Sequence, residues 1–318
     1  MKQTKFYELK HSFLLLITAI IWGIAFVAQK DGMKTIGPLM MSGTRFILGG
    51  LSLIPVILIF ERKGISPLQK KNSYIYGIIA GCVLYFAVNL QQYGILFTGS
   101  SGKAAFITAM YTIIVPIFGL FLGKKTSLLT WLGVALALVG LYFISFNNDF
   151  SISHGDIFLI VGAFFWAAHI MMVDSYVPKV AALRFSMTQF YVCAVLSLIT
   201  IIPLSQSFMQ GTPFYETFTF DGMAEGIVPL LYTGILSSGI AYTLQIVGQK
   251  GVAPAKAAII FSCESLFGAL GGWLFAGEVM TPRSYIGCAL MFCGIIASQL
   301  QIGKKRRKER LEEELNKV

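Results

Sequence analysis

Charged residues are scarce in this sequence, and so are the residue types that most often build catalytic or metal sites. Only 13% of its 318 residues are charged, and it has three histidines and five cysteines, against 56% hydrophobic residues and a mean hydropathy of +0.73. Soluble domains average about 25% charged residues. The chain is therefore expected to lie in a lipid bilayer.

The small set of histidines and cysteines excludes several kinds of site. The sequence contains no CxxC, HExxH or GxSxG motif and no paired aspartates within an apolar run. We therefore expect no disulfide, no bound metal, no cofactor and no enzymatic activity. The cysteines all fall in apolar runs, where cysteine serves as a small buried hydrophobe: Cys82, Cys193, Cys263, Cys288 and Cys293.

Long apolar runs dominate what is present. Ten of them have about the length that a helix needs to cross roughly 30 Å of hydrocarbon. The loops between them are short, which predicts an all-α polytopic membrane protein without a separate soluble domain. The first run is too long for the core of a signal peptide, so we expect it to be retained. The runs cover residues 11–28, 38–60, 73–97, 103–122, 128–146, 156–174, 184–203, 225–247, 254–275 and 283–301.

Basic residues cluster at alternate ends of these runs. If the N-terminus is cytoplasmic, most lysines and arginines fall on the cytoplasmic side, including seven in the charged tail, residues 302–318. This pattern predicts a multi-pass protein of the plasma (inner) membrane with both termini in the cytoplasm. It also accounts for most of the net charge of +10, so no nucleic-acid partner is expected. The tail could in addition bind anionic lipid.

The chain repeats itself. An offset of 144 maps Trp22 onto Trp166, and an offset of 154 maps Gly133 onto Gly287 along about fifty ungapped residues. Each half, residues 11–146 and 156–301, has five runs, and this odd number makes the second half enter the membrane from the opposite side. Such inverted repeats are typical of transporters that work by alternating access, although some channels also have them.

The segments that carry the repeat also resemble a known family. Residues 242–298, "YTLQIVGQKGVAPAKAAIIFSCESLFGALGGWLFAGEVMTPRSYIGCALMFCGIIAS", look like the second EamA domain of the drug/metabolite transporter superfamily, and "NLQQYGILFTGSSGKAAFITAMYTIIVPIFGLFLGKK" (89–125) resembles the first. The resemblance implies a ten-helix transporter of small metabolites, often an exporter of amino acids. The chain departs from the pattern at Lys124, which stands where the second copy has Glu278, and in "CES" (263–265), which lacks a following proline.

Glu264 is the carboxylate within the ninth run. It lies about ten residues, or about 15 Å, from the start of that run, which places it near the bilayer midplane. An ionisable group at this depth is expected to face the protein interior or a wet cavity. Gly268 and Gly271 follow on the same side of the helix and would let another helix approach. Glu264 is a candidate proton carrier, and a structural role in helix packing is the alternative.

Arg45 lies at a similar depth in the second run. It could pair with Glu264, bind a carboxylate of the substrate, or reach to the outer headgroups by snorkelling. His169 in the sixth run could relay protons or bond to a neighbouring helix.

The remaining candidates are polar or aromatic residues inside the runs. Trp22 and Trp166 lie away from the headgroup belts that attract tryptophan and occupy related positions in the repeat, so they are candidates for the wall of a central cavity. Interhelical hydrogen bonding is the alternative for the other polar candidates, which are Asn89, Gln91, Gln245, Tyr111 and Tyr242.

These observations together predict a secondary transporter that exports small metabolites such as amino acids, and they suggest the hypothesis that export is coupled to protons. A carrier of drugs or other organic solutes is the alternative. A channel is less favoured, because the sequence has no TVGYG-type filter. The expected partners are a small-molecule substrate and the lipid bilayer, and the oligomeric state stays open.

Overall fold

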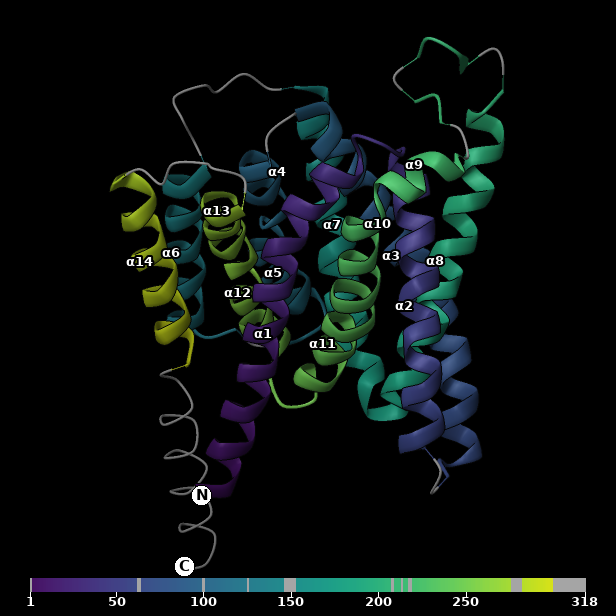
Figure 1. Ribbon diagram of the computed structural model, residues 1–318. Coiled ribbons are helices and arrows are strands. Elements are labelled where there is room, and N and C mark those ends of the chain that lie inside the picture. The colour runs from purple at the N-terminus through teal and green to yellow at the C-terminus, as the bar shows by residue number, and fades with distance from the viewer. Residues whose placement is uncertain are drawn as a thin grey trace, which may run out of the picture.

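The protein is described by a computed structural model that covers residues 2–61, 64–98, 101–124, 126–145, 153–206, 209–212, 214–216, 219–275 and 282–299. The tail 302–318, with its proposed lipid contact, and Glu278 lie outside the described residues. All regular elements in the described part are helical. The start of α1 and the end of α14 lie at the same end of the molecule (Figure 1).

The first half of the chain forms six helices and the second half forms the rest. The first six are α1 (Lys2–Gly32), α2 (Pro38–Phe60), α3 (Pro67–Thr98), α4 (Ser101–Thr108), α5 (Tyr111–Phe121) and α6 (Leu128–Ser145). They are followed by α7 (His154–Tyr176), η1 (Val177–Lys179), α8 (Ala182–Leu204), α9 (Phe220–Glu225), α10 (Ile227–Leu231), η3 (Tyr232–Ala241), α11 (Tyr242–Gln249), α12 (Pro254–Phe261), α13 (Cys263–Phe275) and α14 (Pro282–Gln299).

Seven helical segments of the described chain are long and apolar enough to cross a membrane, and two shorter apolar helices cover 128–143 and 285–298. The exposed faces of these helices carry large apolar side chains, such as Phe60, Phe121 and Ile202. Such an outer surface suits lipid rather than water. The prediction of an all-α membrane protein with several spans is therefore confirmed.

Two of the expected spans are interrupted. The run 103–122 is divided into α4 and α5 at Ala109 and Met110, where the amide of Met110 bonds to the carbonyl of Ile107 three residues back. The run 254–275 is divided into α12 and α13 at Ser262, and the amide of Ser265 bonds to the carbonyl of Ser262. These tighter bonds interrupt the four-residue ladder of an α-helix.

The segment η3 is a π-helix placed between α10 and α11. Ser238 donates its hydroxyl to the carbonyl of Thr233, five residues back, at 2.9 Å. A methyl group added at Gly49 of α2 would come within 2.7 Å of the Ser238 side chain, so α2 crosses the π-helix closely. π-Helices are rare and are frequently found at functional sites.

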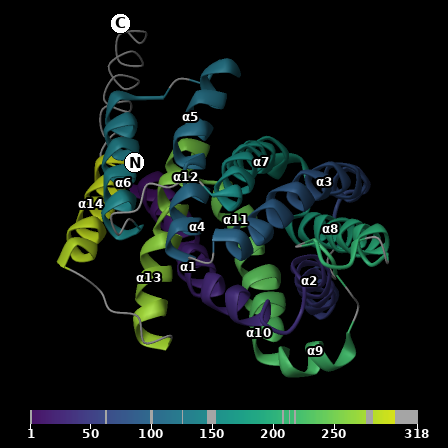
Figure 2. The same ribbon diagram turned by 90° about the horizontal axis from the view of Figure 1, so that it is seen from above.

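Helices α6 and α14 lie at one edge of the molecule, and α2, α3 and α8 lie at the opposite edge (Figures 1 and 2). At the first edge, two glycine contacts bring backbones together. A Cβ added at Gly133 would lie 2.7 Å from the carbonyl oxygen of Gly294, and one added at Gly140 would lie 2.6 Å from that of Gly287. Only glycine permits this approach.

At the end of the molecule away from the start of α1, Glu216 joins the loop after α8 to α2 and α3. Its two carboxylate oxygens each accept from the amide of Leu39 at 3.0 Å, and Tyr93 donates its hydroxyl at 2.6 Å. The amide of Met40 is a further donor at 3.2 Å. Burial raises the pKa of the Glu216 carboxyl, and these donors oppose the rise because they favour the ionised form.

Replacing Gly133 with alanine is expected to lower the free energy of unfolding by about 1–3 kcal/mol, because the added methyl group would overlap a backbone oxygen that cannot rotate away. Thermal unfolding in detergent measures this. Gly119→Ala is the matched control, since the nearest atom to its added Cβ is 3.7 Å away. Equal melting temperatures for the two variants would contradict the close contact of α6 and α14.

Replacing Glu216 with alanine is expected to lower the free energy of unfolding by about 2 kcal/mol, since it removes the acceptor of three buried donors and the carboxylate at the N-terminus of α2. Thermal unfolding of the variant is compared with that of Glu225→Ala, which truncates an exposed glutamate of the neighbouring α9. A loss of stability no larger than in the control would show that this carboxylate does not fix the loop.

Candidate functional site

A narrow cavity lies where the two interrupted helices and the π-helix meet α1, α2, α3 and α7. Centres of water-sized molecules can occupy about 30 Å³ of it, which is room for about two waters. Its wall is formed by Trp22, Ala25, Phe26, Gln29, Arg45, Gln91, Thr108, Tyr111, Trp166, Ile170, Ser237, Tyr242, Gln245, Phe261 and Glu264. Both halves of the chain contribute to this wall.

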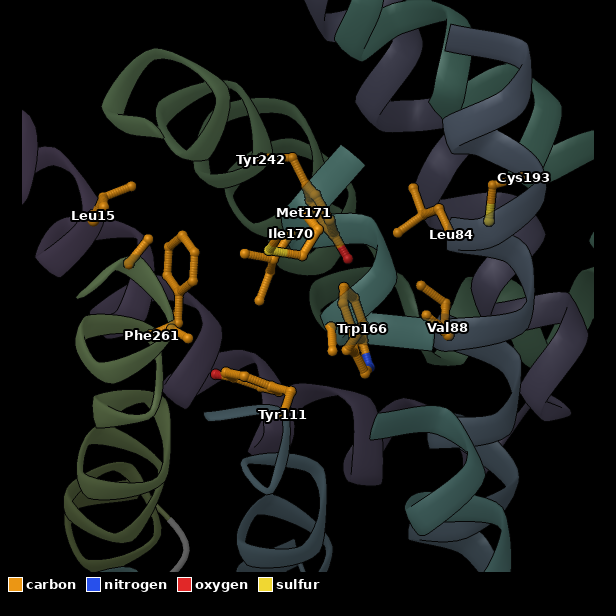
Figure 3. Packing of buried hydrophobic residues seen from close by; sticks show 14 of the residues in the cluster. Leu15, Leu84, Val88, Tyr111, Trp166, Ile170, Met171, Cys193, Tyr242 and Phe261 are labelled. Atoms are coloured by element: carbon orange, nitrogen blue, oxygen red, sulfur yellow. The ribbon is translucent and has the colours of Figure 1, made fainter. Parts of the chain in front are cut away.

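Aromatic rings form one side of the cavity. The ring of Trp22 lies 4.8 Å from that of Tyr242, 5.4 Å from Phe261 and 6.3 Å from Trp166, measured between centroids. Figure 3 shows Trp166, Tyr242, Phe261 and Tyr111 arriving from separate helices around a common space. Flat apolar walls of this kind suit the apolar part of a small molecule.

The π-helix fixes one of these rings. Trp22 donates its indole N–H to the carbonyl of Ser237 at 3.2 Å. The interior position of this tryptophan is thus satisfied by backbone of the opposite half, which explains why it does not lie at a headgroup belt.

Glu264 is the carboxylate of the cavity. It is the second residue of α13, directly after the interruption at Ser262, and it is 5% exposed. Tyr111, the first residue of α5 after the other interruption, donates its hydroxyl to Oε1 at 3.0 Å. The backbone carbonyl of Glu264 leaves no room for a side chain at Gly23 of α1. The residue thus packs closely against α1 through its backbone, while its carboxyl group bonds to Tyr111 at the cavity.

Arg45 is the cation of the cavity. It is 2% exposed and donates from Nη1 to Oε1 of Gln29 at 2.9 Å. Its guanidinium lies 4.9 Å from the ring centroid of Phe46. The side chain does not reach the molecular surface, as snorkelling would require. Among the described residues, no ion pair or hydrogen bond joins Arg45 to Glu264.

Amide and hydroxyl groups complete the wall. Gln91 donates to the hydroxyl of Thr108 at 3.4 Å, and Gln245 donates to Gln249 at 3.1 Å. Gln249 donates onward to the carbonyl of Ile170 at 3.0 Å. The side-chain carbonyl oxygen of Gln245 is buried and has no partner within the described residues.

Eight of the ten residues selected from the sequence line the cavity, and two do not. His169 lies behind the wall and its Nε2 is 2.9 Å from Oε1 of Gln189. Asn89 donates to the hydroxyl of Ser197 and to the carbonyl of Tyr85, each at 2.9 Å, as an interhelical hydrogen bond would require.

Several lining residues were not selected. Gln29 was missed because the expected first span ended at residue 28, whereas α1 continues to Gly32. Thr108 and Ser237 are polar residues within apolar runs, and this polarity is the sequence feature that could have marked them as candidates for the cavity wall. Phe261 and Ile170 resemble any core residue in sequence, so no pattern distinguished them.

The sequence profile of the EamA-like transporter family matches residues 9–146 and 153–299. An uncharacterized transporter of Archaeoglobus fulgidus is 27% identical, with 91% of this chain and 85% of the relative covered. The uncharacterized transporter YoaV of Bacillus subtilis is 24% identical over 92% of this chain and 97% of its own. The uncharacterized inner membrane transporter YedA of Escherichia coli is 22% identical over 87% of this chain and 86% of its own.

A solved crystal structure that is 16% identical superposes with a TM-score of 0.72, covering 93% of this chain and 98% of the other. This likeness concerns the fold alone.

The Thr108→Cys variant is expected to react with a small hydrophilic thiol reagent faster than the Thr112→Cys variant, because Thr108 lines the cavity and Thr112 does not. Thr112 lies four residues further along, beyond the interruption at Ala109 and Met110, is fully buried and donates to the carbonyl of Ala258. Both variants are made in a chain without its five native cysteines, and labelling is followed by mass spectrometry. Similar labelling rates would contradict a cavity that water reaches.

Proposed function

Because the chain belongs to the EamA-like transporter family, we propose that it is a secondary transporter that moves small metabolites through the central cavity by alternating access. It is a multi-pass membrane protein, as its apolar helices and its transporter relatives show. The observation that carries the proposal is a polar and aromatic cavity in the middle of the fold, built from both halves of the chain.

The packing supports two inverted repeats, residues 11–146 and 156–301. Helix α1 of the first half packs against η3 and α11 of the second half, and α7 of the second half packs against α3 of the first half. Likewise α3 packs against α8, and η3 packs against α2. Every one of these contacts becomes its counterpart when the halves are exchanged, as a two-fold axis in the membrane plane requires.

The glycine contacts of α6 and α14 follow the same rule. The offset of 154 makes Gly133 equivalent to Gly287 and Gly140 equivalent to Gly294. The observed contacts join Gly133 to Gly294 and Gly140 to Gly287, so each pair is the image of the other. Two equivalent helices crossing at their own symmetry axis would make this pattern.

The interruptions also correspond. Residues 108–110 at the end of α4 are equivalent, by the same offset, to residues 262–264 at the end of α12 and the start of α13. Interrupted helices near the midplane are a common way for transporters to present backbone and side chains to a substrate. Their meeting at Tyr111 and Glu264 makes this contact a candidate moving part.

The proposed transport direction is export, with protons moving inward in exchange. Glu264 would bind a proton from outside and release it to the cytoplasm, and substrate would occupy the cavity on the return. Amino acids fit a site with one cation, one carboxylate and aromatic walls. Basic residues in alternate loops support an inner-membrane protein with cytoplasmic termini.

Glu264→Gln is expected to abolish substrate accumulation driven by a proton gradient in proteoliposomes, while exchange of labelled for unlabelled substrate continues. Glutamine has nearly the same shape and accepts the bond from Tyr111, but it carries no proton to release. The assay uses a panel of labelled amino acids, other metabolites and cationic drugs. Glu225→Gln, at an exposed position, is the control.

Full gradient-driven accumulation by the Glu264→Gln variant would show that the carboxylate is structural. Single-channel currents proportional to voltage would contradict the carrier mechanism, whereas saturable flux stimulated by substrate on the far side agrees with it. Preferential flux of cationic drugs would favour a multidrug carrier over an amino-acid exporter.

A further inference from the structure

Arg45 carries a buried charge for which the described part of the protein provides little compensation. Its guanidinium has five N–H donors, and it stays protonated in proteins. Nη1 bonds to the neutral amide of Gln29, while Nε has no partner within the described residues. The side chain is 98% buried and forms part of the cavity wall.

No carboxylate in the described part of the protein forms an ion pair with Arg45. The ion pairs join Lys34 to Asp31, Lys124 to Asp174, Arg184 to Glu61 and Lys256 to Glu8, and none includes Arg45. Glu264 accepts its hydrogen bond from Tyr111. An uncompensated guanidinium buried in the protein is energetically costly. A ligand in the cavity that carries a negative charge would supply the missing counter-charge.

The surroundings of Arg45 define what else the ligand carries. Trp22, Trp166, Tyr242 and Phe261 offer flat apolar surfaces at one side. The indole N–H of Trp166 has no partner within the described residues and is a further donor. The wall thus combines unused N–H donors with aromatic faces, which matches an anionic group on a flat apolar body.

We propose that Arg45 is the anchor for a carboxylate group of the substrate, so that the transported compounds are small carboxylates with an apolar body. The fork of the guanidinium would hold both carboxylate oxygens, and the aromatic rings would contact the remainder once the cavity, which here has room for about two waters, has widened. A zwitterion fits as well, with its ammonium group toward Glu264, whereas a simple organic cation would meet Arg45 unfavourably. This inference deepens the proposed transport function and rests on it for its biological meaning.

The test is a binding measurement on the purified full-length protein in detergent, followed by tryptophan fluorescence, because two of the four tryptophans line the cavity. The probes are phenylacetate, its neutral amide phenylacetamide and the cation phenethylamine, with sodium chloride at matched ionic strength as the blank. Wild-type protein should bind phenylacetate at least about tenfold more tightly than either other probe, the ratio that 1.4 kcal/mol gives.

Arg45→Gln should reduce phenylacetate binding to the level of the amide and leave amide binding unchanged. Arg45→Lys, which keeps the charge without the fork, should retain a smaller preference. Arg184→Gln is the matched control and should keep the wild-type preference, since Arg184 pairs with Glu61 away from the cavity. Each variant is first checked by thermal unfolding, and Arg45→Lys serves if Arg45→Gln does not fold.

The proposal is overturned if wild-type protein binds the amide or the amine as well as the acid, if it binds none of the probes, or if both Arg45 variants keep the full preference. Its failure is separable from that of the transport proposal. Arg45-dependent binding without flux of any solute in proteoliposomes would refute transport alone. Saturable flux without a preference for carboxylates would refute the anchor alone.

Discussion

Inside a hydrocarbon layer, polar groups can be satisfied only by the protein itself, and the arrangement of this molecule follows from that constraint. Thr18 donates to the carbonyl of Ala241, Asn89 to Ser197 and Gln249 to the carbonyl of Ile170, each across a helix interface. The outward faces carry large apolar side chains instead. Polar side chains are thereby collected between the helices, and several of them line the cavity.

The same constraint explains how much could be predicted from sequence. Hydropathy was enough to place most helices, because a span must be apolar for its full length. The cost of a charge near the midplane was enough to predict that Glu264 faces inward. For Arg45 the sequence left snorkelling open, since depth along the membrane normal says nothing of rotation about the helix axis.

Features that depend on bonds between specific backbone groups were not predictable. The interruptions at Ala109 and Ser262 have no proline beside them, and the π-helix from Tyr232 to Ala241 has an ordinary apolar composition. Which helices lie side by side was also hidden, so the contact of Tyr111 with Glu264 could not be derived from their spacing of 153 residues. Tertiary packing sets these features, and propensity does not encode it.

The distribution of regular and irregular backbone connects packing to motion. At the edge, α6 and α14 are joined by glycine contacts that leave no room for an added side-chain atom. Around the cavity, two interruptions and a π-helix replace the α-helical ladder with less regular bonds. Such bonds fix the direction of a helix less firmly than a regular ladder, so the less regular backbone lies where the proposed alternating access would need it to move.

The separation of the two buried charges has its own consequence. A direct ion pair between Arg45 and Glu264 would neutralise both, and breaking it would leave two unpaired buried charges. Each is instead held by a neutral partner, Arg45 by Gln29 and Glu264 by Tyr111. A hydrogen bond to a neutral group costs less free energy to break than a buried ion pair, so either charged group can more easily bind a ligand or a proton instead. The cavity can therefore keep one cationic and one acidic group available at once, which a closed ion pair would prevent.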